Sequence, residues 1–470
     1  MFIPFGAQDY VPGRLNQPDI ALRNMYAEEA PHLPHREFQL VPTPGLVARN
    51  TGFAGEAGAC FRTAGLFGGD MWIAAGTTLY RRTALGAVTA AVTGLPAFTY
   101  KPQFASSQSE IGLVQGGNAY KVEGSSATQI TVGAASGNIH GIAQEGQRFL
   151  FLEEGSGRVW FSDPGDIATV GGTSFVTTES ESDPNLAIRV FKKDIILFGS
   201  DTTEIGYFTG SDQVPFRFRD SRMSVGILGY RAHTQTDNDV YFVSDTGRVM
   251  RYQYGNPVPV DTIPVVNHLE DVATADLDRV RLDTYQQGRR AFIILTIPGV
   301  GQFVMDEATG LWHERKRTGQ THGGIGPICQ IDTAVFCLEE GGTTPDLYQL
   351  DREVYTDDGN TIIREATAAF PIVDANLNIQ ALRVEGFGGV GLDGNVQGSE
   401  PVLDLFVSRD GQSYGNAIRR SMGKIGQFRH AIVYGPLGNF KPGVPLFKIQ
   451  YADPVGYTVT GVILNPRERR

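Results

Sequence analysis

The stretch FKKDIILFGSDTTEIGYF, residues Phe191–Phe208, decides the fold of this chain. Its Ile195–Phe198 run is short, apolar and partly β-branched, which predicts a buried strand. A glycine-containing turn follows at Gly199–Asp201, and the next residues alternate apolar Ile205 and Tyr207 with a glutamate and a glycine. The stretch therefore predicts a β-hairpin with one buried and one half-buried strand.

The same hairpin pattern recurs along the chain as an apolar run, a glycine-rich turn and an alternating run. The copies lie at Asp70–Arg82, Glu110–Lys121, Gln147–Asp163, Asp194–Phe208, Asp239–Tyr252, Arg290–Asp306 and Thr333–Leu350. A period in the forties with four strands per unit is the signature of propeller blades. The seven copies predict an all-β chain whose residues 51–360 form a seven-bladed β-propeller; the spacing is also compatible with six or eight blades.

Residues 1–50 are predicted to form an extended N-terminal arm that lies over the rest of the chain. Its prolines are spaced too closely for a continuous helix or a central strand. Because the closed sides of a propeller offer few unpaired strand edges, we expect this arm to be an interface. Its candidate contact residues are Arg23, Asn24, Tyr26 and Pro44.

Two further segments break the hairpin spacing. Val266–Gln287 places apolar residues at steps of three or four, which predicts an amphipathic helical insertion near residues 266–287. Residues 361–470 are predicted to form a separate C-terminal antiparallel β-sandwich. Its expected strands are Ala381–Glu385, Val402–Ser408, Ala431–Val433, Leu446–Tyr451 and Tyr457–Leu464.

The chain ends in a basic tail that is either a frayed end or a further contact site. The candidate interface residues of this tail are Arg467, Arg469 and Arg470.

Composition and charge exclude several classes of protein. Glycine accounts for 58 of the 470 residues, well above the usual share of about 7%, as expected for many short strands and tight turns. The net charge is −11, and lysine and arginine occur as scattered pairs without a basic stripe. Because an acidic balance repels a phosphate backbone, no specific nucleic-acid groove is predicted.

Neither a metal site, a disulfide framework nor a cofactor is predicted. The three cysteines Cys60, Cys329 and Cys337 include no Cys-x-x-Cys pair, and the eight histidines show no ligand spacing. The N-terminus lacks the pattern of a signal peptide, and the longest apolar run, Ala291–Leu295, is too short to cross a bilayer. We expect a chain made in a reducing compartment, with no export signal and no membrane partner.

Three motifs resemble functional signatures but lack the context that the chemistry requires. Gly386–Gly391 spells G-x-G-x-x-G, yet further glycines replace the helix that a dinucleotide site needs. Ser421–Lys424 spells S-x-x-K without a helix that could carry a nucleophile. Ser408–Tyr414 resembles the Asp-box turn of sialidase-type propellers, but it occurs once, so a structural turn is favoured. No catalytic residue is predicted.

Taken together, these elements resemble the packaged-DNA stabilisation, or tail hub, proteins of short-tailed bacteriophages of the P22 type. The resemblance covers most of the chain and rests on the order and spacing of short elements. These are Arg23–Tyr26 with Pro44–Leu46, Lys193–Phe208, Val225–Gly229, the helical insertion running into Ala291–Pro298, Met305–Trp312 and Ser408–Gly415. The chain departs from the resemblance in the glycine-rich loop Gly386–Gly398 and in its arginine-rich C-terminus, where partner contacts would differ.

The resemblance implies a structural virion protein of the phage tail, not an enzyme, that is assembled in the host cytoplasm. Such a protein is expected to form a homo-hexameric ring beneath the portal and its head-to-tail adaptor. It would close the DNA exit channel after packaging and receive the tail needle, tail fibres or tailspikes. Genomic DNA would pass through the ring, or be retained behind it, without specific binding.

Two alternatives stay open on the sequence alone. The first is a carbohydrate-active propeller, either a glycoside hydrolase or a lectin. A hydrolase would need two carboxylates that face each other. Glu153, Glu154 and Asp245 are the candidates, all in expected hairpin turns. The second alternative is the nozzle-type tail tubular protein of other short-tailed phages.

Overall fold

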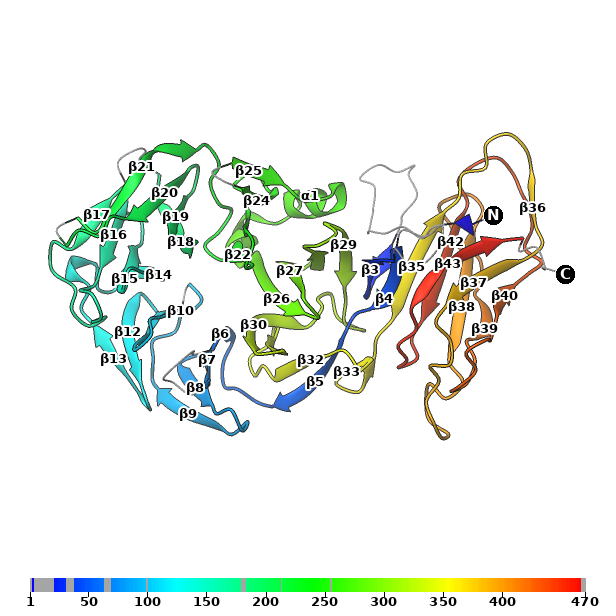
Figure 1. The fold of residues 1–470 in the computed structure, drawn as a ribbon, viewed down its shortest axis with the longest axis horizontal. Coiled ribbons are helices and arrows are strands. Elements are labelled where there is room, and N and C mark those ends of the chain that lie inside the picture. The colour runs from blue at the N-terminus through cyan, green and yellow to red at the C-terminus, as the bar shows by residue number, and fades with distance from the viewer. Residues whose placement is uncertain are drawn as a thin grey trace.

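The computed structural model describes residues 2–3, 21–30, 38–62, 69–98, 100–178, 183–212, 214–253 and 256–465. These residues form an all-β molecule in which small sheets surround a common centre and two larger sheets lie to one side (Figure 1).

The hairpin of residues 191–208 is the middle of a four-stranded antiparallel sheet. Strands β19 (Asp194–Gly199) and β20 (Thr203–Phe208) pair with Ile196 opposite Ile205. The flanking strands are β18 (Asn185–Phe191) and β21 (Phe216–Met223). The whole of β19 from Ile195 onward is buried, because both faces of this sheet are covered by neighbouring sheets.

Each of the other hairpins expected from the sequence is likewise the middle pair of a four-stranded unit. Four of these units are complete four-stranded sheets. The first two are β6 (Ala57–Arg62), β7 (Met71–Ala75), β8 (Thr78–Arg82) and β9 (Val88–Thr93), and then β10 (Gln103–Ser106), β11 (Ile111–Gln115), β12 (Asn118–Glu123) and β13 (Ser126–Ile130). The other two are β14 (Ile139–Glu145), β15 (Arg148–Glu153), β16 (Arg158–Phe161) and β17 (Phe175–Thr177), and then β22 (His233–Gln235), β23 (Val240–Val243), β24 (Val249–Gln253) and β25 (Asn256–Pro259).

The last two units belong to larger sheets. They are β26 (Arg281–Gln287), β27 (Arg290–Ile297), β28 (Gly301–Asp306) and β29 (Trp312–Arg315), and then β30 (Ile325–Ile331), β31 (Ala334–Glu339), β32 (Leu347–Asp351) and β5 (Gly45–Asn50). In the second of these units the outer strand comes from the N-terminal part of the chain, with Leu46 opposite Leu350. The chain is thus joined to itself at the start and end of the series.

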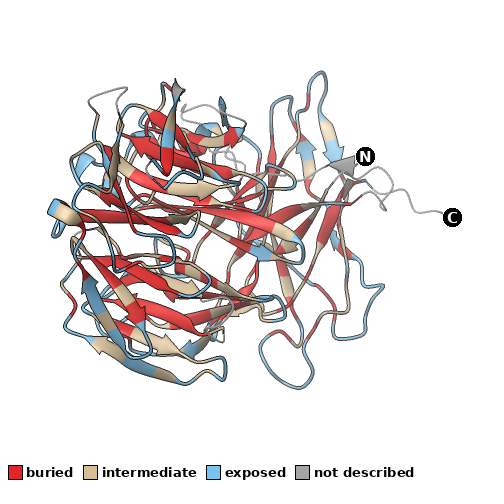
Figure 2. Ribbon diagram, turned by 60° about the vertical axis from the view of Figure 1, so that its left-hand side comes forward, coloured by how far each residue is buried: buried red, intermediate tan, exposed pale blue. Residues whose placement is uncertain are grey.

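Apolar clusters between consecutive units hold the sheets together. Trp72 packs with Leu113 between the first two units, and Phe198 packs with Phe242 further along. The last unit packs against the first, where Phe336 and Met71 share one cluster. Figure 2 shows this burial as red strand interiors with exposed loops at the rims. A four-stranded sheet cannot bury both of its faces alone, so this stacking supplies the stability that single hairpins lack.

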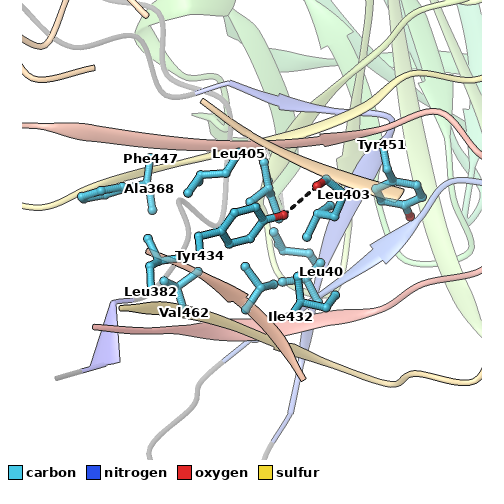
Figure 3. Close-up of a cluster of buried hydrophobic side chains, with 14 of the residues drawn as sticks. Leu40, Ala368, Leu382, Leu403, Leu405, Ile432, Tyr434, Phe447, Tyr451 and Val462 are labelled. Atoms are coloured by element: carbon cyan, nitrogen blue, oxygen red, sulfur yellow. Dashed lines mark hydrogen bonds between the residues drawn. The ribbon is translucent and has the colours of Figure 1, made fainter. Parts of the chain in front are cut away.

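Two groups of strands, a six-stranded sheet and the C-terminal part of the nine-stranded sheet, enclose a second core (Figure 3). One contains β3 (Met25–Glu29), β4 (Phe38–Pro42), β43 (Val459–Leu464), β37 (Leu382–Gly386) and β40 (Ile432–Tyr434), with β1 (Phe2–Ile3) paired to β43. The facing strands are β2 (Leu22–Arg23), β35 (Arg364–Ala369), β42 (Leu446–Tyr451), β38 (Val402–Ser408) and β39 (Ile418–Ser421). Tyr434 in this core donates its hydroxyl to the carbonyl oxygen of Leu403 at 2.7 Å.

Short strand pairs complete the structure. These are β33 (Thr356–Asp357) with β34 (Asn360–Thr361), and β36 (Leu377–Ile379) with β41 (Gly438–Phe440). The strands expected after residue 361 coincide with β37, β38, β40, β42 and β43 to within two residues.

Residues 21–30 and 38–50 are part of the sheets, whereas the sequence predicts that residues 1–50 form an extended arm lying over the rest of the chain. They form strands β2 to β5, which are built into three separate sheets. Strands of two to six residues fit between closely spaced prolines, and Pro42 and Pro44 stand at the end of β4 and just before β5. The proline spacing therefore marks the ends of short strands here, not an unpaired extended segment.

The prediction of a helical insertion near residues 266–287 is wrong for the second half of this segment. A helix, α1, covers Ile263–Glu270, and a 3₁₀ helix covers Thr274–Arg279. The rest is β26, in which Tyr285 pairs opposite Phe292. The apolar period was misleading because it combined Val266 and Leu269 of α1 with Leu277 of the 3₁₀ helix and with Val280, a buried residue just before β26. Among the described residues, no helix is long and apolar enough to cross a membrane.

Candidate functional site

A cavity of about 430 Å³ lies at the centre of the ring of sheets. Its walls come from the first strands of six sheets, β6, β10, β14, β18, β22 and β26. The innermost strand of a propeller sheet turns one edge and alternate side chains toward the centre, which explains why residues distant in sequence meet there. Three arginines, Arg189, Arg231 and Arg281, line the cavity together with a single carboxylate, Asp283.

Side chains that precede the inner strands cross the ring and narrow one end of this cavity. The Tyr100 and Tyr230 rings meet edge to face with their centroids 4.7 Å apart. The Arg231 guanidinium donates from Nη2 to the carbonyl oxygen of Gly58 at 2.9 Å, and Lys101 donates to the backbone at the start of β6. The Tyr100–Tyr230 and Arg231–Gly58 contacts join units that are not neighbours in the ring, so they brace it across its centre, whereas the Lys101 contact joins two adjacent units.

The three arginines have different surroundings. Arg281 is paired with Asp283 and with Glu340, whose Oε2 lies 2.6 Å from Nη1. Arg189 instead donates from Nε and Nη2 to Nδ1 of His233 at 3.1 and 3.0 Å. Burial lowers the pKa of Arg189 to about 10, and burial together with the nearby Arg281 guanidinium lowers that of Arg231 to about 10.

His233 is neutral in this arrangement. An arginine can only donate, so Nδ1 accepts and the ring proton is on Nε2. Burial, and next the charge of Arg189, hold the pKa of His233 well below its usual value.

The acids considered as catalytic candidates have structural partners. Trp160 donates from Nε1 to Glu153 at 2.9 Å, and the Tyr100 hydroxyl donates to Glu154 at 2.7 Å. Asp245 accepts from the backbone N–H of Gly226 at 3.2 Å. Each carboxylate therefore has a structural hydrogen-bond partner, which for Glu153 lies in the next strand of its own sheet, and the hydrogen bond to Glu154 raises the pKa of Tyr100.

The Asp410 turn between β38 and β39 is structural. Its carboxylate accepts from the Ser408 hydroxyl at 2.9 Å and from the backbone N–H groups of Gln412 and Ser413 at 2.9 and 2.8 Å. Hydrogen bonds from the hydroxyl and backbone of Ser413 lower the pKa of Asp410. The predicted role as a turn is confirmed by these hydrogen bonds.

The other two motifs also lack functional geometry. No helix follows Gly386–Gly391, so the N–H groups that would hold a pyrophosphate are missing from this loop. Lys424 forms an ion pair with Glu400, and Ser421 accepts from the backbone N–H of Gly423 at 3.1 Å. Neither residue is placed to activate the other.

Within the described ranges, no group of three histidine, cysteine, aspartate or glutamate side chains could hold a metal ion. Burial raises the pKa of the Cys329 and Cys337 thiols to about 12, and that of Cys60 well above its usual value. The three thiols are therefore protonated at neutral pH and poorly nucleophilic.

The candidate contact residues of the N-terminal segment contact other parts of the same chain. Asn24 is 1% exposed and donates from Nδ2 to the carbonyl oxygens of Lys316 and Ile363, each at 2.8 Å. Arg23 pairs with Glu314 at 2.6 Å.

The other predicted contact residues follow the same pattern where they are described. Tyr26 packs edge to face on Phe292 with ring centroids 5.4 Å apart, and Pro44 is buried. Arg467, Arg469 and Arg470 lie outside the described residues.

A cluster of exposed apolar side chains lies on two loops of the C-terminal part. Phe387, Ile425 and Phe428 are 50, 57 and 75% exposed. The loops touch each other, since the N–H of Gly426 donates to the carbonyl oxygen of Gly389 at 3.3 Å. A Cβ on Gly389 would lie 2.5 Å from Phe428, so the ring rests on this glycine. We call Phe387, Ile425 and Phe428 the aromatic patch.

Sequence reasoning did not identify the aromatic patch. The only signal was the glycine-rich loop itself, which was weighed as a nucleotide-binding motif. A glycine that makes room for a ring on a neighbouring loop leaves no periodic pattern in the sequence.

Three comparisons with known proteins complete the description of the site. A family model named Phage_stabilise and described as "Bacteriophage P22 Gp10, beta-propeller" matches residues 14–312. No curated protein matches the sequence.

Among solved structures, the chain is similar to a streptogramin B lyase, with 13% identity over 65% of this chain and 97% of the other and a TM-score of 0.46. It is similar to virginiamycin B lyase from Staphylococcus aureus, with 13% identity over 63% and 95% of the two chains and a TM-score of 0.44. The β-propeller domain of Myceliophteria thermophila Cps50 (Swd1) has 8% identity over 64% and 99% and a TM-score of 0.44.

Proposed function

The chain belongs to the family of bacteriophage β-propeller proteins described by P22 Gp10, and from this premise we propose that it is a structural protein of a phage tail. It forms a ring below the portal and its adaptor, closes the DNA exit channel after packaging, and links the head to a needle or tail fibres. The seven four-stranded units are the blades of a closed propeller, and the C-terminal sheets form a sandwich beside it.

The observation that carries this proposal is the aromatic patch. Large apolar side chains that are clustered and exposed on a soluble domain mark a protein interface. Permanent interfaces between identical subunits are more apolar than transient ones, and most soluble oligomers are cyclic assemblies of one chain. We therefore assign Phe387, Ile425 and Phe428 to the contact between neighbouring copies in the ring.

The connection between the two parts of the chain supports a role under mechanical load. Strand β2 pairs with β29 of the sixth blade on one side and with β35 of the C-terminal sheet on the other. The result is one continuous nine-stranded sheet that crosses the domain boundary. A shared sheet resists hinge motion, because bending would break its backbone hydrogen bonds.

The central cavity of each propeller is not the path of the DNA in this proposal. At about 430 Å³, and with one end crossed by Tyr100, Tyr230 and Arg231, it is a size that suits a small molecule. The DNA passes instead along the axis of the assembled ring, where the net charge of −11 per chain disfavours tight binding to phosphate.

Mass photometry of the purified chain and its variants tests the assignment of the aromatic patch. Phe428→Ser and Ile425→Ser remove apolar area from the patch, and each is expected to shift the ring toward monomer while the thermal unfolding temperature stays within a few degrees. Val373→Ser is the matched control, since Val373 is an exposed apolar residue, 76% accessible, outside the two loops of the patch.

Rings that form equally well with both patch variants would contradict the assignment of the patch to subunit contacts. A monomeric wild type that hydrolyses or binds a glycan would contradict the proposed function and favour the carbohydrate-active alternative.

A further inference from the structure

We propose that the centre of the propeller binds a small oxyanion, a phosphate or carboxylate group, between the guanidinium groups of Arg189 and Arg231. The two side chains come from β18 and from the residues before β22, and both line the cavity of about 430 Å³. The site is independent of ring assembly, and so it stands or falls separately from the proposed function.

The two guanidinium groups are positive charges without acidic partners. Among the described residues, Arg189 and Arg231 form hydrogen bonds with His233 and with the carbonyl oxygen of Gly58, but no ion pair with a carboxylate. The nearest acid of the cavity, Asp283, is already paired with Arg281. Charges enclosed in this way are costly unless an opposite charge joins them.

Both side chains have donors left over for a ligand. A guanidinium carries five N–H donors in a planar fork that matches two oxygens of a carboxylate or phosphate. Arg189 uses Nε and Nη2 toward His233, and Arg231 uses Nη2 toward Gly58. Within the described part of the chain, neither arginine has a nitrogen that is both fully buried and unpaired, so the remaining nitrogens are not fully enclosed by protein, and both residues line the cavity.

The surroundings hold the two groups in place before a ligand arrives. Neutral His233 accepts from Arg189 and fixes its plane, while Gly58 on the opposite side of the ring fixes Arg231. Preorganised donors lose little conformational entropy on binding, which favours affinity for a small ligand. Burial lowers the pKa of both arginines, and the charge of Asp283, which is paired with Arg281, offsets this effect only in part.

The rest of the wall limits the ligand to a small one. Ile142, Ile188 and Leu282 supply apolar surface, and Gln144 and Gln235 supply amides. A cavity of this volume falls in the range of about 300–1,000 Å³ that is usual for small-molecule sites. Phosphate, citrate and the carboxylates of similar size fit this description, and duplex DNA does not.

Isothermal titration of the full chain with inorganic phosphate and, separately, with citrate tests the proposal. We expect binding of at least one of the two with a stoichiometry of one per chain. Arg189→Met and Arg231→Met should each weaken it roughly ten- to a hundredfold, since each removes charge-assisted hydrogen bonds. Arg429→Met, at an exposed arginine of the C-terminal part, should leave it unchanged.

Arg189→Lys keeps the charge but loses the fork, and an affinity between those of wild type and Arg189→Met is expected. Circular dichroism shows whether the methionine variants fold. If they do not, Arg189→Lys still tests the site with a smaller change of side chain. The proposal is overturned if neither anion binds. It is also overturned if the folded variants bind phosphate or citrate as tightly as wild type does. A thermal unfolding series gives a further check: the proposal is overturned if sodium chloride of equal ionic strength raises the unfolding temperature as much as phosphate does.

Discussion

Arg315 and Asp357 form an ion pair at the junction between the propeller and the C-terminal sheets, with Nη2 2.6 Å from Oδ1 and side chains only 2% and 0% exposed. Arg315 belongs to β29, and Asp357 belongs to β33, which pairs with β5. Arg315 also donates from Nη1 to the hydroxyl of Thr43 at 2.8 Å. One buried guanidinium therefore joins β29, Thr43 of the N-terminal segment and β33, which lies just before the C-terminal strands.

Arg315→Met is expected to lower the free energy of unfolding by about 3–5 kcal/mol, because it leaves the Asp357 carboxylate buried without a partner. Urea denaturation followed by tryptophan fluorescence measures this loss. The double variant Arg315→Met with Asp357→Leu should be less destabilised than the sum of the two single variants, since it leaves no lone charge.

The control for this pair is Asp332→Asn. Asp332 is 79% exposed and pairs with Arg62 at 3.0 Å, and its loss should cost less than about 1 kcal/mol. Equal losses at the two sites would show that burial of the Arg315–Asp357 pair is unimportant.

Asn24 is the second residue expected to join the two parts of the chain. It adopts a left-handed backbone conformation with φ of 53°, and its side chain accepts from the N–H of Lys316 and donates to two carbonyl oxygens. Asn24→Ala removes three hydrogen bonds, and a loss of about 2–4 kcal/mol is expected from thermal or urea unfolding.

Asn24→Gly separates the contribution of the side-chain hydrogen bonds from that of backbone strain, because glycine adopts the positive φ without strain. If Asn24→Gly is as stable as wild type, the side-chain hydrogen bonds do not contribute as we expect. If it is less stable than wild type but more stable than Asn24→Ala, the difference measures the backbone strain.

His313 should make the protein sensitive to acid. Burial, and next the charge of Arg315, lower its pKa to about 3 in the folded chain, whereas an unfolded histidine titrates near 6.5. Between these values the unfolded chain binds a proton that the folded chain does not, so stability falls as the pH falls below about 6.5. The slope is at most about 1.4 kcal/mol per pH unit for one histidine.

His313→Phe keeps a buried ring and should reduce the loss of stability between pH 6.5 and 4.5. Part of the dependence of stability on pH should remain in His313→Phe, because burial also lowers the pKa values of His140 and His233. His430→Phe, at an exposed position, is the control. Parallel curves of unfolding free energy against pH for wild type and His313→Phe would refute the role of His313.

The sequence was sufficient to predict the strands that repeat, and insufficient for those that do not. The hairpins could be found because each alternates around a glycine-rich turn, as at Ile195–Tyr207, and because the pattern recurs at a steady spacing. Strand β5 could not be assigned to the last blade, because its partner β32 lies about 300 residues away and no local signal encodes that pairing. Strand β2 depends on a similarly distant partner, β35, whereas β3 pairs with the nearby strand β4.

The candidate sites could be predicted only where they depend on residues close together in the sequence. Glu153 and Asp245 stayed candidate acids of the carbohydrate-active alternative on the sequence alone, because their hydrogen-bond partners, the side chain of Trp160 and the N–H of Gly226, are visible only in the structure. That Arg189 and Arg231 line one cavity could not be predicted, because 42 positions separate them and only the ring arrangement brings both to its centre. The aromatic patch depends on contact between two loops, Gly386–Gly391 and residues 424–428, which is equally invisible in the sequence.

Gly226 connects the blade of the opening hairpin to the next blade, and its lack of a side chain is essential. The N–H of Ile227 donates to the carbonyl oxygen of Gly199 at 2.9 Å, which brings Gly226 against the turn of that hairpin. A Cβ on Gly226 would overlap with the backbone of Ser200 and lie 2.5 Å from the nitrogen of Asp201. Since both obstacles are backbone atoms, no rotamer change can relieve the clash.

Gly226→Ala is therefore expected to lower the free energy of unfolding by about 1–3 kcal/mol, through displacement of the turn at Ser200. Gly172→Ala is the matched control, since a Cβ at Gly172 would meet no atom within 4 Å, and its effect should stay within about 0.5 kcal/mol. Urea unfolding of the two variants measures the difference. A Gly226→Ala variant as stable as Gly172→Ala would mean that this blade can move away from its neighbour without cost, and the rigid propeller on which the proposed tail ring depends would then be excluded.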